Sequence, residues 1–260
     1  MGFTSRLRAV SAIAVAASLA ATGATAASSA ASRPAAHHHV ASIHPGVPVT
    51  LAGVTCEAGF LMHQGKVVYV AFPSSCAGID TGMVQDGCSE ASAPNGMPVT
   101  IGGARHRAIL VYKSFAAMAL HGTVNSHRCY YNDLALARLN HRDWHRASGA
   151  VPTHDGPSGV TTKAPAKGTP LTMLLSALKM ATAGQSHMGG WEQDVTTSAS
   201  LTTENVGAPV LDPQHRLLGM VTALPSGVLI KTPAEVYSLH RALRQLHHVR
   251  AFRHIKLLRG

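Results

Sequence analysis

From residue 49 onwards, short runs of apolar and β-branched residues alternate with glycine, proline and polar turn residues. Runs of this length and composition predict β-strands. The expected strands span residues 49–54, 59–62, 67–72, 98–102, 108–112, 134–139, 206–211 and 217–223. Turns are predicted at Gln64-Gly65, at Gly103 and at Pro213-Gln214-His215. Many short strands with such turns indicate an all-β barrel or sandwich.

Two segments carry a helical period instead. In residues 171–183, the leucines at positions 171, 174, 175 and 178 share one helical face. The surroundings of that segment look like a β-protein, so helix and strand both stay open there. The segment that starts at Pro233 is a clearer helix, because Thr232 suits its N-cap and proline suits its first turn. Apolar residues at positions 236, 239, 243 and 246 then form a stripe along it.

The N-terminus has the three parts of a secretory signal. Arg6 and Arg8 precede a small apolar run over residues 9–22, and Ala24-Thr25-Ala26 has the small–x–small pattern that signal peptidase accepts. We therefore predict a signal peptide over residues 1–26, cleaved near Ala26, and a secreted mature protein. No later stretch reaches about 18 uninterrupted apolar residues, so no membrane span is expected. Residues 27–48, rich in Ala, Ser, His and Pro, are expected to be a flexible linker.

Composition narrows the class of protein. Hydrophobic residues make up 46% of the chain, which is too apolar for a disordered protein. The formal charge is +10 with neutral histidines, and 17 histidines add further positive charge below about pH 6.5. A basic balance of this kind attracts nucleic acid, anionic lipid or cell-wall polyanions, or simply keeps a secreted protein soluble.

Basic residues and histidines also gather locally. Residues 247–260 are expected to form a basic C-terminal tail, which is a candidate for docking on an anionic cell-surface polymer. The run His37-His38-His39 could hold a transition metal loosely, but a solvated linker explains it better. His141 and His145 have the i, i+4 spacing of some metal ligands, without the glutamate that a zinc protease needs. We expect no bound metal and no cofactor.

The four cysteines are Cys56, Cys76, Cys88 and Cys129. An even number in an exported chain favours two disulfides, and three pairings are possible. The cysteines form no CxxC pair, which disfavours a zinc ribbon or a thioredoxin-like site.

Three motifs in order carry a resemblance to a known family. The runs CEAGFL at 56–61 and YVAFPSSCAG at 69–78 are similar to the opening of a trypsin-like serine protease. In that family the residue before the second cysteine is the catalytic histidine, and that residue is Ser75 here. The run YNDLALARL at 131–139 resembles the family's Asn-Asp strand, in which the aspartate orients the histidine, and Asp133 matches it. The run ENVGAPVLD at 204–212 resembles the nucleophile loop, with Val206 at the place of the serine.

The resemblance covers roughly residues 49–245 and looks closest to an actinobacterial secreted branch of the family. It implies an all-β fold of two six-stranded antiparallel β-barrels with a C-terminal α-helix, in a domain over residues 49–246. It also implies disulfides between Cys56 and Cys76 and between Cys88 and Cys129. We expect this domain to be a monomer.

The departures from the motifs decide the functional expectation. Acyl transfer in this family needs a hydroxyl nucleophile activated by an imidazole base. Val206 has no atom that attacks a carbonyl, and Ser75 has no basic lone pair near neutral pH. Asp133 then has no histidine to orient and is expected to accept hydrogen bonds from nearby backbone or hydroxyl groups.

The sequence therefore predicts a pseudoprotease with no competent catalytic residue, in which the old cleft binds a protein or peptide or the fold serves as a scaffold. Two alternatives stay open. One is an active secreted serine endopeptidase with a non-standard site, and the other is a polyanion- or metal-binding surface protein. The sequence names no ligand or partner.

Overall fold

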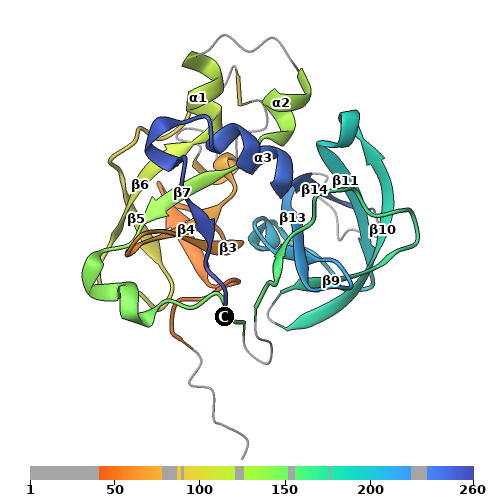
Figure 1. Ribbon diagram of the computed structural model, residues 1–260, viewed down its shortest axis with the longest axis horizontal. Coiled ribbons are helices and arrows are strands. Elements are labelled where there is room, and N and C mark those ends of the chain that lie inside the picture. The colour runs from red at the N-terminus through yellow and green to blue at the C-terminus, as the bar shows by residue number, and fades with distance from the viewer. Residues whose placement is uncertain are drawn as a thin grey trace, which may run out of the picture. The chain divides into compact units, whose positions relative to one another are not determined.

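Two β-sheets side by side make up the folded part of the computed structural model (Figure 1). The structure describes residues 41–77, 87–88, 91–120, 126–151, 156–175, 177–223 and 233–260. The predicted signal peptide, most of the predicted linker and the run of histidines at 37–39 lie outside these residues.

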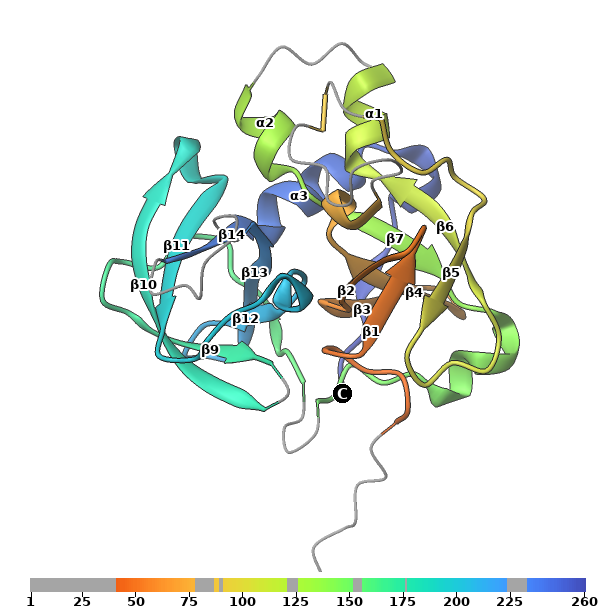
Figure 2. The same ribbon diagram turned by 180° about the vertical axis from the view of Figure 1, so that it is seen from behind.

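The first sheet has eight strands in the order β15-β3-β4-β7-β6-β5-β1-β2. They are β1 (Pro48–Leu51), β2 (Val54–Glu57), β3 (Phe60–Gln64), β4 (Val67–Phe72), β5 (Pro98–Ile101), β6 (Ala108–Lys113), β7 (Ala135–Arg138) and β15 (Lys256–Leu257). Only Ala58 and Gly59 separate β2 from β3, although the two strands pair at opposite ends of the sheet. The sheet is therefore curled into a half-barrel, with β2 and β3 as two arms of one bent segment (Figure 2).

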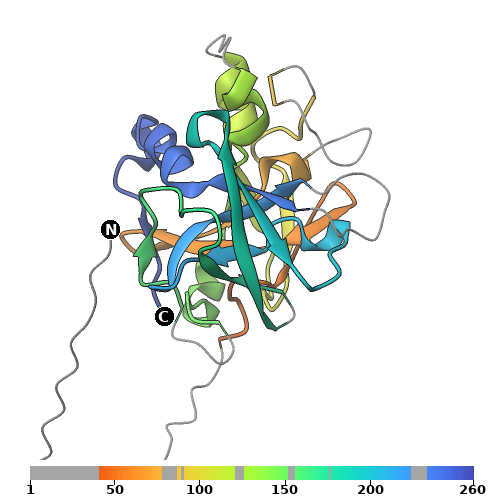
Figure 3. The same cartoon turned by 90° about the vertical axis from the view of Figure 1, so that its right-hand side faces the viewer.

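The second sheet closes on itself. Its strands are β8 (Gly159–Val160), β9 (Pro170–Leu174), β10 (Leu178–His187), β11 (Glu192–Thr197), β12 (Pro209–Leu211), β13 (Arg216–Ala223) and β14 (Ala234–Ser238). The order is β12-β9-β10-β11-β14-β13, and β12 also pairs with β13, which completes a six-stranded barrel. The short strand β8 adds to the edge of β13 in parallel. Figure 3 looks onto this barrel across the long strand β10.

Short helices connect and cover the sheets. They are η1 (Ser74–Ala77), α1 (Ser114–Leu120), α2 (Ser126–Tyr131), η2 (His141–Arg146), η3 (Met188–Gly190), η4 (Thr203–Asn205), α3 (Leu239–Leu246) and η5 (Arg250–Phe252). The half-barrel and the closed barrel each enclose an apolar core. A third apolar cluster joins the two sheets to α3. In that third cluster Phe60 of the first sheet, Met220 of the second and Leu246 of α3 are all fully buried.

The expected mostly-β fold with a C-terminal helix is confirmed. One detail differs, since the first barrel is a curled sheet of eight strands and only the second is a closed ring of six. The predicted turns are confirmed: Gly65 and Gly103 have φ of 59° and 78°, and His215 turns the chain from β12 into β13 with φ of 58°. Both predicted disulfides, Cys56–Cys76 and Cys88–Cys129, are present.

The structure decides the segment that was left open between helix and strand, and it corrects the expected start of the C-terminal helix. Residues 171–183 form parts of β9 and β10, which pair with each other through Leu171 and Ala181. Residues after Pro233 form strand β14 before the helix, which begins only at Leu239 with Ser238 as its N-cap. Barrel closure needs β14 between β11 and β13, and this pairing overrides the local helical stripe.

The basic segment 247–260 packs on the first sheet. Phe252 and Ile255 are 7% and 3% exposed, and β15 pairs with β3. The positively charged side chains of Arg250, Arg253 and Lys256 are exposed. The segment is therefore an integral part of the first sheet with a cationic outer surface.

Candidate functional site

Ser75 lies in the short helix η1, directly after the buried strand β4. Pro73 ends the strand, and its carbonyl accepts a hydrogen bond from the Cys76 amide at 3.2 Å. The Cys56–Cys76 disulfide ties η1 to strand β2. All four side chains of η1 are buried, so Ser75 is held in a fixed place on the first sheet.

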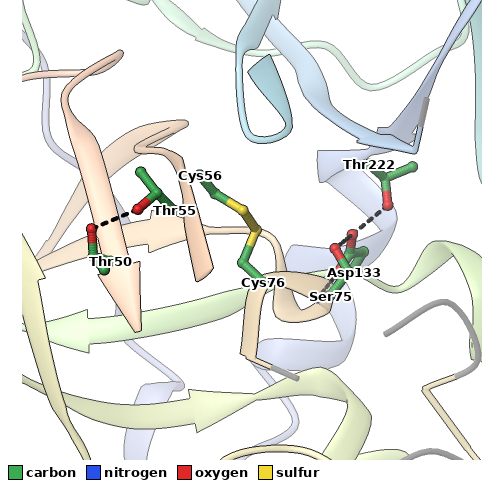
Figure 4. The surroundings of a disulfide bond; sticks show 7 residues. All are labelled: Thr50, Thr55, Cys56, Ser75, Cys76, Asp133 and Thr222. Atoms are coloured by element: carbon green, nitrogen blue, oxygen red, sulfur yellow. Dashed lines mark hydrogen bonds between the residues drawn. A yellow bond between two sulfur atoms is a disulfide. The ribbon is translucent and has the colours of Figure 1, made fainter. Parts of the chain in front are cut away.

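Asp133 is the centre of a buried hydrogen-bond network (Figure 4). Its Oδ1 accepts from the Ser75 backbone amide at 2.6 Å, and its Oδ2 accepts from the Ser75 hydroxyl at 2.8 Å. The Thr222 hydroxyl, from strand β13 of the second barrel, donates to the same Oδ2. The sequence expectation that Asp133 accepts from nearby backbone and hydroxyl groups is therefore confirmed.

The protonation of Asp133 follows from this burial. Burial raises the pKa of Asp133 from 3.8 to about 6, although hydrogen bonds from Thr222 and from Ser75 lower it. Removing a carboxylate from water disfavours its charged form, while donors that point at the oxygens stabilise it. Burial and the nearby charge of Asp133 also raise the pKa of Tyr237 well above its usual value, so this phenol stays neutral.

Val206 lies directly after η4, in the loop that leads to β12. Its carbonyl accepts from the Glu57 amide at 2.8 Å, and the next amide, of Gly207, donates to the Val221 carbonyl at 2.8 Å. Gly207 has φ of +103°, and a Cβ there would lie 2.1 Å from the Glu57 carbonyl, so only glycine fits. The Val206 side chain is 1% exposed and packs in the core of the first sheet, where Cys56 and Cys76 also lie.

Hydrogen bonds connect the loop that contains Val206 with the Ser75–Asp133 pair. Ser75 touches Asp133 directly. Gly207, next to Val206, is bonded to Val221, whose neighbour Thr222 is bonded to Asp133. Ser75 and Asp133 are therefore in direct contact, and the loop that contains Val206 is connected to them through strand β13.

A second acidic group lies beside the Val206 loop. The Asn205 amide donates to Oε1 of Glu57 at 3.1 Å, which links η4 to strand β2. Burial raises the pKa of Glu57 from 4.5 to about 7; the Asn205 hydrogen bond lowers this pKa, and the negative charge of Glu204 raises it. Glu57 is therefore a carboxyl group that changes charge near neutral pH at the junction of the two sheets.

The chemistry open to this site is limited by the groups that face it. Ser75 is only 5% exposed. Its hydroxyl donates a hydrogen bond to the carboxylate of Asp133, which is fully buried. A nucleophile must reach a substrate carbonyl and pass its proton to a base. Val206 offers only an aliphatic side chain at the third position.

Sequence reasoning missed Thr222 and Glu57. Thr222 falls in an apolar strand run, LLGMVTA, and a single hydroxyl there carries no local signal. Glu57 follows the disulfide cysteine Cys56, where a charged residue in a strand suggests exposure. Only the packing of the second barrel against the first reveals the role of either side chain.

Other expectations concern metals and membranes. The described residues contain no group of three or more His, Cys, Asp or Glu side chains placed to hold one metal ion. His141 and His145 lie in η2, where the His141 ring contacts the edge of Trp144. Within the described part of the chain, no helix combines the length and apolar character needed to cross a membrane.

Comparison with solved structures defines the class of fold. The chain has the fold of the chymotrypsin-type serine proteases. It is similar to Thermobifida fusca protease A, with a TM-score of 0.53, 13% identity and coverage of 84% of this chain and 99% of that one. It is equally similar to Cellulomonas bogoriensis chymotrypsin, with a TM-score of 0.53, 13% identity and the same coverages of 84% and 99%.

A third structure, an alpha-lytic protease homologue called N4, has a TM-score of 0.50 and 13% identity over 78% of this chain and 96% of that one. No protein-family model matches the sequence, and no curated protein matches it either. At such identities the similarity establishes the fold.

Proposed function

We propose that this chain is an exported, non-catalytic relative of the chymotrypsin-type serine proteases. The observation that carries the proposal is the Ser75–Asp133 pair. Ser75 stands where the motif has its histidine, and its hydroxyl and backbone amide both donate hydrogen bonds to the Asp133 carboxylate. Val206 supplies no nucleophile at the third position. Loss of the catalytic serine or histidine from such a triad lowers turnover by about 10⁶.

Export is part of the proposal. The signal-like N-terminus and the two disulfides favour an oxidising compartment outside the cytoplasm. In this interpretation the hydrogen bonds of Asp133, which a protease uses to orient its base, serve to hold the two sheets together through Thr222. The protein then acts by binding or as a scaffold.

The direct test is an activity assay on the purified mature chain. A panel of fluorogenic peptides and a fluorophosphonate probe should show neither cleavage nor covalent labelling, while an active chymotrypsin-type protease in parallel shows both. The rival hypothesis, an endopeptidase with a non-standard site, predicts labelling. Labelling that disappears in Ser75→Ala or Ser74→Ala would assign the nucleophile to η1 and overturn the proposal.

A second candidate function is polyanion binding by segment 247–260. The observation in its favour is that the segment packs by Phe252 and Ile255 while its charged side chains, such as Arg250 and Arg253, stay exposed. Because deletion would remove β15, the better test replaces charges in place. Binding to heparin should fall steeply with salt and weaken in Arg250→Gln/Arg253→Gln, with Arg142→Gln as the control. Unchanged binding in the double variant would exclude this surface.

A further inference from the structure

The first sheet carries two neighbouring hollows whose described lining does not include Ser75, Asp133 or Val206. The first has a volume of about 370 Å³ and the second about 500 Å³. Both volumes lie in the range of about 300–1,000 Å³ that is typical of ligand sites. Arg138, on the central strand β7, lines both hollows and therefore lies between them.

Strand pairing shows how the two hollows are arranged along the sheet. Arg138 pairs with Ile109 of β6 on one side and with Tyr69 of β4 on the other. The lining of the two hollows extends along β6 from Arg107 to Lys113. At about 3.4 Å per residue, six steps correspond to about 20 Å along the strand. The two hollows thus form one elongated groove with a cation in its middle, which we name the β7 groove.

Apolar side chains form most of the walls. In the first hollow they include Val67, Ile109 and Trp144. The Trp144 indole donates from Nε1 to the Leu139 carbonyl at 3.2 Å, which fixes the ring in place. In the second hollow, Tyr69 and Tyr112 both contact the Phe252 ring edge-to-face, at centroid distances of 5.9 and 5.5 Å.

The charged side chains that line the groove among the described residues are all basic. Arg107 and Arg138 are exposed, and no described acidic residue lines either hollow. The ion pairs found among the described residues involve the carboxylates of Asp143, Asp194 and Asp212, each with another partner. Asp133 and Asp143, which lie equally far from Arg138 along the chain, are both fully buried. Asp143 is bonded to the His106 and Arg105 amides, and Asp133 to Ser75 and Thr222. Arg138 is therefore available to an anion from outside.

From this arrangement we infer that the β7 groove binds an extended acidic peptide segment, with an apolar side chain in each hollow and a carboxylate between them on Arg138. In an extended peptide, residues i, i+2 and i+4 face the same side and span about 13 Å. A guanidinium pairs with a carboxylate through two parallel hydrogen bonds, which gives both affinity and direction. The chain's own residues 1–40 contain no Asp or Glu and cannot supply this carboxylate, and the ligand of this proposal is a segment of another molecule.

The test uses the mature chain labelled with ¹⁵N and three blocked pentapeptides. The first has leucine, glutamate and phenylalanine at positions one, three and five, with serine between them. The second has glutamine in place of the glutamate, and the third has serine in place of both apolar residues. We expect the first to shift the Trp144 indole and Arg138 amide signals and to bind at least fivefold more tightly than either of the others.

Variants then locate the contact. Arg138→Gln should weaken binding of the glutamate peptide at least fivefold and leave the glutamine peptide unchanged. Arg142→Gln, an exposed arginine of η2 that does not line either hollow, is the matched control and should bind as the parent does.

Equal binding of the three peptides, signal shifts confined to other parts of the molecule, or no binding at millimolar peptide would each overturn the proposal. If Arg138→Gln fails to fold, the comparison of the three peptides on the unmodified chain still decides. Because the groove is separate from Ser75 and Asp133, this result is independent of whether the protein cleaves peptides.

Discussion

At the scale of single residues, the Asp133 network is the feature with the greatest energetic consequence. A carboxylate that is fully buried needs hydrogen-bond donors, and it receives them from both sheets. Removing one donor leaves a charged acceptor partly unsatisfied, which costs about 1–3 kcal/mol or more. Thr222 is the only one of these side chains that the second barrel contributes among the described contacts of Asp133.

Thr222→Val keeps the shape of the side chain and removes its hydroxyl. We expect the free energy of unfolding to fall by about 1–3 kcal/mol at pH 7, because Asp133 loses a donor while it remains buried. Chemical denaturation measures this loss. Thr222→Ser, which keeps the hydroxyl, is the control and should recover most of the stability. A valine variant as stable as the parent would show that the hydrogen bond has no net effect.

Glu57 predicts a pH dependence of stability. Its pKa is 4.5 in the unfolded chain and about 7 in the folded protein, so between these values the folded state holds an extra proton. Its contribution is complete below about pH 4.5 and is lost as the pH rises through 7, at about 1.4 kcal/mol for each pH unit that separates the two pKa values. Asp133 acts in the same direction between pH 3.8 and about 6.

Glu57→Gln removes this titration and keeps an acceptor for Asn205. We expect its free energy of unfolding to decline less than that of the parent between pH 4.5 and 7, as measured by urea titrations across this range. Glu204→Gln, an exposed neighbour, should change the slope much less. Identical slopes in parent and Glu57→Gln would mean that Glu57 does not bind a proton in this window.

At the scale of elements, segment 247–260 functions as part of the first sheet rather than as a tail. Its aromatic anchor Phe252 is 7% exposed and contacts two tyrosines of β4 and β6. Strand β15 adds to the edge of β3 at Lys256 and Leu257. Removal of the anchor is therefore expected to loosen both the sheet edge and the wall of the β7 groove.

Phe252→Ala should lower the free energy of unfolding by about 3–5 kcal/mol, which is the usual cost of truncating a buried phenylalanine. Thermal or chemical unfolding of the full chain measures it. The neighbouring Arg253→Ala removes an exposed side chain and should change stability by no more than about 0.5 kcal/mol. Equal stability of the two variants would indicate that the segment does not contribute to the folded core.

The sequence predicted the elements well where one signal dominated and poorly where two signals competed. Strands bounded by glycine turns, such as those around Gly65 and Gly103, occur close to the expected places. In residues 171–183 the leucine spacing fits a helix, yet β9 and β10 bury Leu171 and Ala181 as paired strands. The pairings that fix these strands in the barrel, β9 with β12 and β10 with β11, involve residues outside this segment and leave no trace in a local window.

The candidate site could be predicted only where its residues lie in local sequence motifs. Ser75 and Asp133 lie in recognisable motifs, so their meeting was expected from sequence. The β7 groove was not, because its walls combine β6, β7 and η2 with β4 and with η5, which lie far from them in the chain. No motif joins Arg138 to Trp144 and Phe252; only the folded sheet does.

At the scale of the whole molecule, two disulfides stabilise the first sheet and its covering helices. Cys56–Cys76 closes a sequence separation of 20 residues, and Cys88–Cys129 closes one of 41 residues. Each cross-link restricts the unfolded chain and contributes about 2–4 kcal/mol. The described cysteines are all paired, so the oxidised form is the folded reference state.

Replacing Cys88 and Cys129 together with serine should therefore lower the free energy of unfolding by about 2–4 kcal/mol while the Asp133 network stays intact. Denaturation with and without reductant measures the effect, and reductant should destabilise the parent by more than the variant. The Cys56→Ser/Cys76→Ser pair should disturb Ser75 as well, because that disulfide holds η1 against β2. A variant as stable as the parent would contradict the role of the cross-link.

The pairing of β15 with β3 has a consequence for how the polypeptide is made. Lys256 lies opposite His63, so about three quarters of the chain's length separates these partners. During synthesis, strand β3 cannot complete this edge until residues 256 and 257 have emerged. Such distant pairings also slow folding, since the intervening loop must be closed first. Completion of the first sheet is accordingly expected to be a late event in folding, when residues 256 and 257 pair with β3.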